Sequence, residues 1–316
     1  MQPINPYILI SAVVLDLLMG DPRWFPHPVV YMGKLITHLE KGLRKSVPNE
    51  RLGGALLLVM TVGISCGAAA AILKLAYGVN SYLGHAVAVV LSWSCLAARS
   101  LHRESRQVAD PLSRGELATA RGYLSMIVGR DTAELDEPEI WRATVETVAE
   151  NTSDGVIAPL FYLCLGGPVL AIAYKAVNTL DSMVGYRNER YLEFGRASAR
   201  FDDLANFIPA RLTGLLMVAA APLSGFSAKN SWRIMGRDGR NHSSPNSGIP
   251  EAAAAGALGV MLGGTNLYGG RPVEKPTIGD PVQKISRASW LGAVRLMYGA
   301  EALMVAGWLV ISKVFF

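Results

Sequence analysis

The sequence predicts an all-α protein, a multi-pass integral membrane helical bundle with large cytoplasmic loops. Hydrophobic residues make up 51% of the 316 residues and charged residues only 17%, and the mean hydropathy is +0.28. Soluble domains carry about 25% charged residues, so this composition argues against a soluble globule. The apolar residues gather in windows long enough to cross a bilayer. Lys and Arg gather between certain windows, which is typical of membrane proteins.

Five apolar windows lie near 4–20, 53–77, 84–101, 204–225 and 291–316. A helix needs roughly 20 residues to cross the hydrocarbon core of a membrane. The first window precedes Arg23, the first basic residue, so it does not have the charge order of a cleavable signal peptide. We expect it to remain as the first membrane helix.

A sixth apolar window, 156–174, is interrupted in the middle by Gly166, Gly167 and Pro168. Proline removes a backbone donor and breaks a helix. We therefore predict a re-entrant hairpin near 156–174, a kind of irregular backbone that is tolerated at membrane depth only where protein or a polar cavity surrounds it. An ordinary kinked spanning helix is the alternative.

The basic residues predict the orientation. The segment 21–52 contains six Lys and Arg residues, whereas the segment 78–84 contains none. Basic loops stay in the cytoplasm, so the loops at about 21–52, 102–155, 175–203 and 226–290 are all expected on that side. A re-entrant hairpin would also keep Lys175, Arg187 and Arg200 there. The chain is expected to be a single integral membrane domain, 1–316, in the inner cell membrane.

Composition also excludes several classes of function. The net charge is +5 and the isoelectric point is near 9.1, yet no basic run or aromatic-rich RNA motif accompanies the charge, so nucleic acid is not an expected partner. Cys66, Cys95 and Cys164 lie in apolar segments without CxxC spacing, so neither disulfides nor a zinc site is expected. P-loop, dinucleotide, metalloprotease and kinase motifs are absent.

Most of the polar groups capable of chemistry lie between Glu146 and Arg211. Magnesium prefers hard oxygen ligands and phosphate prefers Arg or Lys, so the mixture of acids and cations in this stretch predicts a metal–phosphate site. The acids are Glu146, Glu150, Asp154, Asp181, Asp202 and Asp203. Glu146 and Glu150 share a helix face, as do Lys175, Asn178 and Asp181. Pairing of these charges on a solvated surface is the alternative.

Two further blocks are candidates. The first membrane window contains Asp16, and an intramembrane acid is a functional candidate; His27 follows it after a proline-rich turn. The block 238–251 contains Arg240, His242 and Asn246, and resembles a phosphate-binding loop that leads into a helix N-terminus. A plain turn followed by a capped helix is the alternative. The surrounding region, 226–290, is expected to be rich in loops.

Several motifs follow one another along the chain: GDPRWFPHPVVYMGKLI, ETVAENTSDGVIAPLFY, YKAVNTLDSMVGY, FGRASARFDDLANFIPARL, DGRNHSSPNSGIPEAAAAGALG and LGGTNLYGG. Taken together and in order, they closely resemble the adenosylcobinamide-phosphate synthase family of cobalamin biosynthesis. The resemblance runs nearly end to end. One departure is Ile249, where members of the family usually have an aromatic residue.

This resemblance implies an ATP-dependent ligase of the membrane that uses Mg²⁺ and joins a carboxylate of adenosylcobyric acid to an amine. The amine would be aminopropanol phosphate, ethanolamine phosphate or an unphosphorylated alcohol. A homo-oligomer or a complex with other enzymes of the pathway is left open.

Roles for individual residues follow as hypotheses. Glu146, Glu150 and Asp154, with Asp202 and Asp203, would hold magnesium. Substrate and phosphates would be bound by Lys175, Asn178, Arg187, Arg200, Arg240, Asn246 and His27. His242 or Asp181 would take the amine proton, and Glu150 is counted among the catalytic residues.

Two other functions compete with ligation. Asp202-Asp203-Leu204-Ala205-Asn206 looks like an incomplete Asp-rich diphosphate motif, which favours a prenyl or phospho-alcohol transferase. The break at Gly166–Pro168 and the intramembrane Asp16 would suit a transporter of a polar substrate. Most of the charges lie in predicted loops, which favours the enzyme.

Overall fold

The computed structural model describes residues 4–22, 24–186 and 188–315. Within these residues the chain forms helices, one π-helical turn and a two-stranded hairpin, in agreement with the predicted helical class. By contacts it divides into two compact units. Unit 1 comprises Met1–Ala97, Ala158–Asn206 and Trp308–Phe316, and unit 2 comprises Ala98–Ile157 and Phe207–Gly307. The single domain 1–316 stays a prediction.

Four helical segments of the described residues are long and apolar enough to cross a membrane, and a fifth is added if one bent pair counts as a span. The four are Glu50–Val79, Ser81–Ser113, Glu137–Val184 and Arg287–Val314; the bent pair is Arg196–Ala205 with Phe207–Leu223, at 42°. They contain or overlap five of the six apolar windows. The first window forms a shorter apolar helix, Pro6–Met19.

The predicted break in the sixth window is confirmed. Helix α8 (Ala158–Val184) has non-helical backbone angles at Gly166, with φ −147°, and at Gly167, with φ +68° and ψ −164°. A positive φ is accessible to glycine at little cost, and Pro168 cannot donate the next helical hydrogen bond. Whether the two halves form a re-entrant hairpin or one kinked span stays a prediction.

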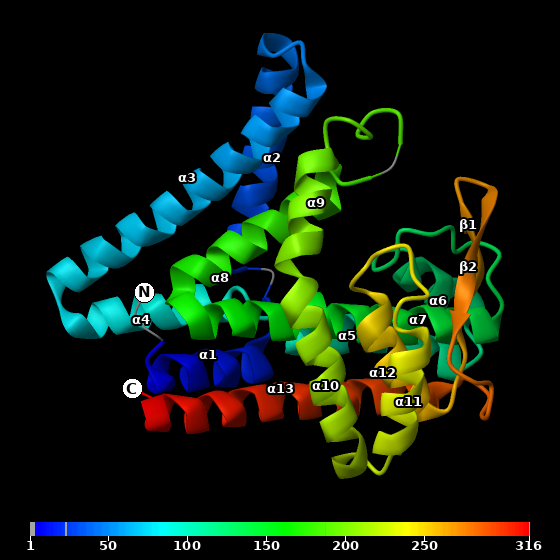
Figure 1. The fold of residues 1–316 in the computed structure, drawn as a ribbon. Helices are drawn as coiled ribbons and strands as arrows, with labels where there is room; N and C mark the ends of the chain where they lie inside the picture. The colour runs from blue at the N-terminus through cyan, green and yellow to red at the C-terminus, as the bar shows by residue number, and fades with distance from the viewer. Residues whose placement is uncertain (1–3, 23, 187, 316) are drawn as a thin grey trace. The chain divides into compact units, whose positions relative to one another are not determined.

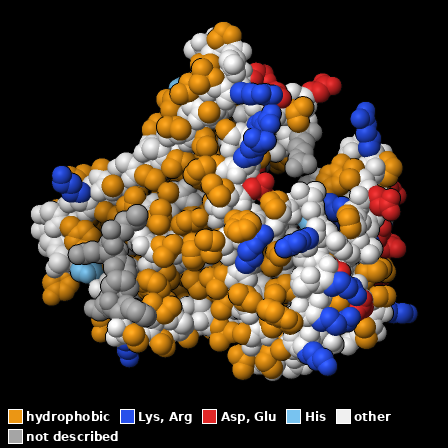
Figure 2. Space-filling model, in the orientation of Figure 1, with side chains coloured by type: hydrophobic (Ala, Val, Ile, Leu, Met, Phe, Trp, Pro, Cys, Tyr) orange, Lys and Arg blue, Asp and Glu red, His pale blue; other side chains and the backbone are white. Residues whose placement is uncertain are grey.

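Unit 1 contains α1 (Pro6–Met19), α2 (Pro28–Ser46), α3 (Glu50–Val79), α4 (Ser81–Trp93), α8 and α9 (Arg196–Ala205). Helix α3 packs against α2, α4, α8 and α9 (Figure 1). A buried core joins α2, α3, α8 and the segment before α9; its members are Ile36, Leu57, Leu180, Val184 and Phe194. Several large hydrophobic side chains of α3 are exposed, among them Val59, Ile64 and Leu75, as expected for a helix that faces lipid. Hydrophobic side chains, mixed with other residues, are visible over this part of the molecule (Figure 2).

Unit 2 contains α5 (Ala98–Ser113), α6 (Leu117–Leu124), α7 (Glu137–Asn151), the π-helix η1 (Thr152–Ile157), α10 (Phe207–Leu223), α11 (Ala228–Asp238), α12 (Gly248–Leu258), β1 (Leu262–Tyr268), β2 (Arg271–Ile278) and most of α13 (Arg287–Phe315). The small residues of α12 let it pack closely against α10 and α11, and most of α12 is buried.

The hairpin lies in the region that the sequence led us to expect as loop. Strands β1 and β2 pair antiparallel, and their turn is made by Gly269 and Gly270, both with positive φ, as a tight hairpin requires. Pro272 and Pro276 lie in β2. Proline is tolerated in a strand with a free edge, but in a sequence it argues against a strand. The two prolines are therefore the reason that the sequence did not predict β2.

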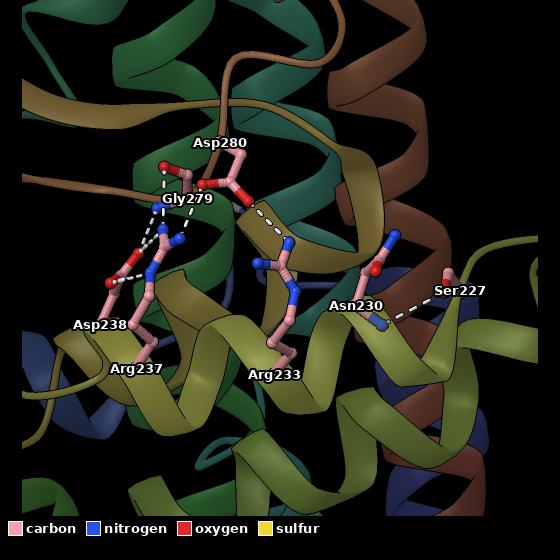
Figure 3. A network of polar contacts seen from close by, with 7 residues as sticks. All are labelled: Ser227, Asn230, Arg233, Arg237, Asp238, Gly279 and Asp280. Carbon is pink, nitrogen blue, oxygen red and sulfur yellow. Dashed lines mark hydrogen bonds and ion pairs between the residues drawn. The ribbon is translucent and has the colours of Figure 1, made fainter.

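An ion-pair network attaches the end of β2 to α11 (Figure 3). Arg237 bonds both carboxylate oxygens of Asp238, at 2.7 and 2.6 Å, and its Nη1 lies 2.8 Å from Asp280 Oδ1. Arg233 Nη2 lies 2.6 Å from the other oxygen of Asp280. The backbone N–H of Gly279 donates to Asp238 at 2.8 Å. The network thus fixes where the chain leaves the hairpin.

We expect Arg237→Ala to loosen this attachment in a pH-dependent way. Hydrogen bonds from Arg237 lower the pKa of Asp238, and hydrogen bonds from Arg233 and Arg237 lower the pKa of Asp280. The stabilisation is therefore complete above the ordinary aspartate pKa of about 3.9 and is lost as the pH falls through the lowered values. Hydrogen exchange of residues 279–284 should accelerate in the variant at neutral pH.

The same comparison should show a shrinking difference between wild type and variant toward about pH 3. Lys229→Ala, an exposed change on the same helix, is the control and should leave exchange unaltered. Equal exchange in wild type and Arg237→Ala at neutral pH would show that the network does not hold the hairpin.

Candidate functional site

The end of α7 positions the first two acids of the site. A capping box of Asp136 and Glu139 starts the helix, and Glu146 and Glu150 follow one turn apart near its end. The chain then widens into the π-helix η1. Single π-helical turns within α-helices are frequent at functional sites. The side chains of Glu146 and Glu150 nevertheless have different surroundings.

Glu146 is buried and fully engaged by donors of unit 2. Its Oε2 accepts a hydrogen bond from Arg130 Nη2 at 2.5 Å, and its Oε1 accepts from the backbone N–H of Gly263 at 2.8 Å. Arg130 also donates from Nη1 to Asn266 Oδ1 at 2.6 Å. Arg142 Nε lies 3.9 Å from Glu146 Oε1. Glu146 therefore ties α7 to the hairpin, and both oxygens are already used.

Glu150 instead faces the loop before α12. Its Oε1 accepts a hydrogen bond from Ser247 Oγ at 2.9 Å. In the same loop, the Nδ1 of His242 accepts from the backbone N–H of Ser244 at 3.0 Å. A neutral histidine that accepts at Nδ1 carries its proton on Nε2. His242 in this geometry is therefore a donor at Nε2 rather than an acceptor.

A third acid, Glu251, completes this cluster from the first turn of α12. It is only 5% exposed. Burial, and then repulsion from Glu150 and Glu146, raise the pKa of Glu251 well above its ordinary value. Burial also lowers the pKa of His242, against the opposing effect of Glu150. Lys275 on β2 contributes positive charge near both. We call Glu150, His242, Ser247, Glu251 and Lys275 the acidic cluster.

Two predicted phosphate-binding residues lie in the same part of unit 2. Asn246 is buried, and its Oδ1 accepts from Arg211 Nη1 at 3.1 Å. Arg240 is exposed, and its charge acts on Arg211. Two guanidinium groups that repel one another form a favourable place for an anion. The block 238–251 thus brings His242 and Ser247 close to Glu150, and Asn246 and Arg240 close to Arg211. Whether this block binds phosphate stays a prediction.

Three other predicted residues meet in unit 1, in a polar pocket of about 410 Å³. His27 caps α2, with its Nε2 3.3 Å from Asp21 Oδ1. Lys175 and Asn178, one turn apart on α8, line the same pocket. Lys175 contributes positive charge to this pocket.

Three predicted aspartates of unit 1 lie on α8 and α9: Asp181, Asp202 and Asp203. Asp202 is 8% exposed, and its Oδ2 accepts from Asn206 Nδ2 at 2.9 Å. Asp181 and Asp203 both act electrostatically on Asp202. Arg200 is exposed and lines a separate pocket with Arg51 and Arg196. Of the remaining predicted residues, Asp154 lies in η1, in unit 2, and Arg187 lies outside the described residues.

The acids do not form a magnesium cage. Among the described residues, no group of three or more His, Cys, Asp or Glu side chains is arranged to hold a metal. Magnesium, however, is usually bound by one or two carboxylates together with substrate phosphates. Glu150 and Glu251 fit that mode, because a cation would relieve their mutual repulsion. Glu146 is a weaker candidate, since Arg130 already offsets its charge and each of its oxygens accepts one hydrogen bond; its metal role stays a prediction.

Sequence reasoning missed three contributors to these sites. Lys275 lies in a strand that the sequence did not reveal, and Arg130 lies in the predicted loop 102–155. Glu251 is the last residue of the block 238–251 and was given no role. Its position four residues after Ser247, at the start of an alanine-rich helix, was the available signal.

Comparison with known proteins shows which family the sequence matches. The model of the family described as CobD/Cbib protein matches residues 9–297. The cobalamin biosynthesis protein CobD of Geobacter metallireducens is 68% identical over 94% of each chain. That of Pelobacter propionicus is 57% identical over 96% of this chain and 94% of its own. The cobalamin biosynthesis protein CbiB of Salmonella typhimurium is 49% identical over 93% of each. No solved structure matches the chain.

Proposed function

Since this chain belongs to the CobD/Cbib family of cobalamin biosynthesis, we propose that it is an ATP-dependent ligase acting on a corrinoid. The bond formed is an amide between a propionate carboxylate of adenosylcobyric acid and the amine of (R)-1-amino-2-propanol O-phosphate or ethanolamine phosphate. The resemblance of the motifs to adenosylcobinamide-phosphate synthases supports this reaction, and the acidic cluster is the observation that carries it.

The proposed chemistry needs groups of both charges. A carboxylate is a poor acyl donor, so the γ-phosphoryl group of ATP is transferred to it and ADP leaves. The amine then attacks the carbonyl carbon of the acyl phosphate and displaces phosphate. Both steps concentrate negative charge on phosphate oxygens, which fixed cations and donors stabilise.

The acidic cluster supplies these groups. Glu150 and Glu251 would hold Mg²⁺ through ATP phosphates, and the metal would offset the charge of the transferred phosphoryl group. Lys275 and Arg240 bind phosphate oxygens, and His242 donates a hydrogen bond from Nε2. His242 is thereby moved from the predicted role of base to that of donor. Asp181 remains the sequence-predicted acceptor for the amine proton.

We further propose that the chain lies in the inner cell membrane with its catalytic loops in the cytoplasm. The support is the excess of Lys and Arg in 21–52 over 78–84. ATP is a cytoplasmic substrate, so an outward-facing acidic cluster would not meet it.

We expect detergent-purified protein to release ADP and form a corrinoid amide when it is given adenosylcobyric acid, Mg²⁺-ATP and one of the two phosphorylated amines. The corrinoid product is identified by mass, and each amine is tested separately. Omission of the amine is the control. The two amines differ by one methyl group. A pocket can discriminate such a difference by about 10–200-fold in kcat/KM, so one of the amines should be preferred.

An unchanged corrinoid mass and intact ATP with every amine would contradict ligation. Uptake of a labelled substrate into vesicles would then favour a transporter, and release of diphosphate from a prenyl substrate would favour a transferase.

A further inference from the structure

An apolar chamber of about 510 Å³ lies within unit 1, outside the residues given a role in ligation. Helices α2, α3, α4 and α8 and the turn before α2 form its walls. The lining is almost entirely hydrocarbon, with two serines and Tyr31 as its polar members. A polyamide macrocycle such as a corrinoid would leave its amides unpaired here, at a cost. An acyl chain would not.

The chamber opens toward the lipid-facing side of the bundle. Ile64 and Ile72 of α3 line it and are still 46% and 49% exposed. Only 17% of the most apolar window of α3 is buried within the structure, the lowest value among the candidate spans of the described residues. A membrane helix exposed to this degree contacts lipid tails, so an acyl chain can enter the chamber from the bilayer.

The chamber adjoins the polar pocket of unit 1. Phe25 and Ser94 line both cavities. The polar pocket lies where α1 and α4 end, since Trp93 Nε1 at the end of α4 donates to the carbonyl of Gly20 at 3.2 Å. The pocket at these two helix ends has polar lining residues, so it offers a place for a lipid headgroup. An apolar chamber thus adjoins a polar pocket, in the order in which a phospholipid presents its tail and head.

The charges of the polar pocket favour an anionic head. Lys175 is the one lysine among the described lining residues. The first turn of α2, with Val29 and Val30, contributes the positive end of a helix. Asp21 is the one acid among the described lining residues, and its carboxylate faces His27 at 3.3 Å. Asn178 and Ser182 add polar groups for ester and phosphate oxygens.

We propose that unit 1 binds one anionic phospholipid, with an acyl chain in the apolar chamber and the headgroup phosphate at Lys175. This site is separate from the proposed ligation chemistry and does not depend on it. It replaces the soluble phosphate that the sequence suggested for Lys175 and His27 with the phosphate of a membrane lipid.

The test is native mass spectrometry of delipidated protein in detergent, titrated with phosphatidylglycerol and, separately, with phosphatidylcholine of the same acyl chains. We expect one phosphatidylglycerol to bind at least roughly tenfold more tightly than phosphatidylcholine. Both lipids carry a phosphate, but the cationic choline of phosphatidylcholine offsets that charge and is repelled by the Lys175 ammonium, whereas phosphatidylglycerol keeps a net negative charge. Lys175→Met should abolish the preference and Lys175→Arg should keep it.

Ala68→Phe should weaken binding of both lipids, because Ala68 is exposed and lines the chamber, so that the larger ring fills it. Ala70→Phe, at an exposed alanine of the same helix outside the lining, is the matched control and should bind like wild type.

Two results would overturn the proposal. One is equal binding of both lipids by the wild type. The other is a combined result: ethanolamine phosphate displaces phosphatidylglycerol at matched concentration, and Ala68→Phe has no effect. That result would show that the pocket binds a soluble phosphate instead of a lipid.

Discussion

Replacing Glu150 with Gln is expected to reduce turnover by roughly a thousandfold or more while leaving the fold intact. Glutamine has the volume of glutamate and keeps an oxygen that can accept the hydrogen bond from Ser247, which is 2.9 Å long in the structure. It removes only the negative charge. If Glu150 holds magnesium through ATP phosphates, that charge is the feature the reaction needs. ADP release in the presence of all substrates is the measurement.

Glu134→Gln is the matched control, because Glu134 is exposed and precedes α7, so its loss of charge should leave ADP release unaltered. Corrinoid binding by the Glu150→Gln protein, followed by absorbance, should stay near that of wild type. Wild-type turnover by Glu150→Gln would remove this residue from the metal and catalytic roles. Loss of corrinoid binding together with turnover would indicate a folding defect instead.

The predictable part of the fold was the part governed by local chemistry. Apolar windows of sufficient length predicted the membrane helices, and Gly166-Gly167-Pro168 predicted the break in α8 at the residues where it occurs. The first window was predicted as a span but forms only the 14-residue helix Pro6–Met19, too short to count as a span by itself. The length of this helix is set by the residues that cap it, Asn5 at the start and Gly20 at the end. Hydropathy does not show where such caps lie.

The site was only partly predictable, because side-chain partners are decided by tertiary contacts. Spacing on one helix predicted that Glu146 and Glu150 share a face. It could not show that Arg130 and the Gly263 N–H donate to Glu146, whereas Ser247 donates to Glu150. Likewise, the tautomer of His242 follows from the Ser244 N–H. The sequence shows which side chains are charged, but it does not show which hydrogen-bond donor contacts each of them.

The largest effect on stability is expected for Arg130→Met. The Arg130 and Glu146 side chains are 9% and 7% exposed, and their atoms Nη2 and Oε2 are 2.5 Å apart. Removing one partner of a buried ion pair leaves an uncompensated charge, which costs about 3–5 kcal/mol. The variant also frees Asn266 Oδ1, which accepts from Arg130 at 2.6 Å. We expect a lower midpoint of thermal unfolding in detergent, or a protein that does not accumulate.

The double variant Arg130→Met, Glu146→Gln distinguishes a structural role of Glu146 from the predicted metal role. It removes the stranded carboxylate along with its partner, so part of the lost stability should return, because an uncharged buried group is cheaper to bury than an unpaired charge. If Glu146 instead holds magnesium, Glu146→Gln alone should unfold like wild type yet require far more Mg²⁺ for ADP release. A destabilised Glu146→Gln protein with an ordinary Mg²⁺ requirement is the result that the contacts of Arg130 and Gly263 lead us to expect.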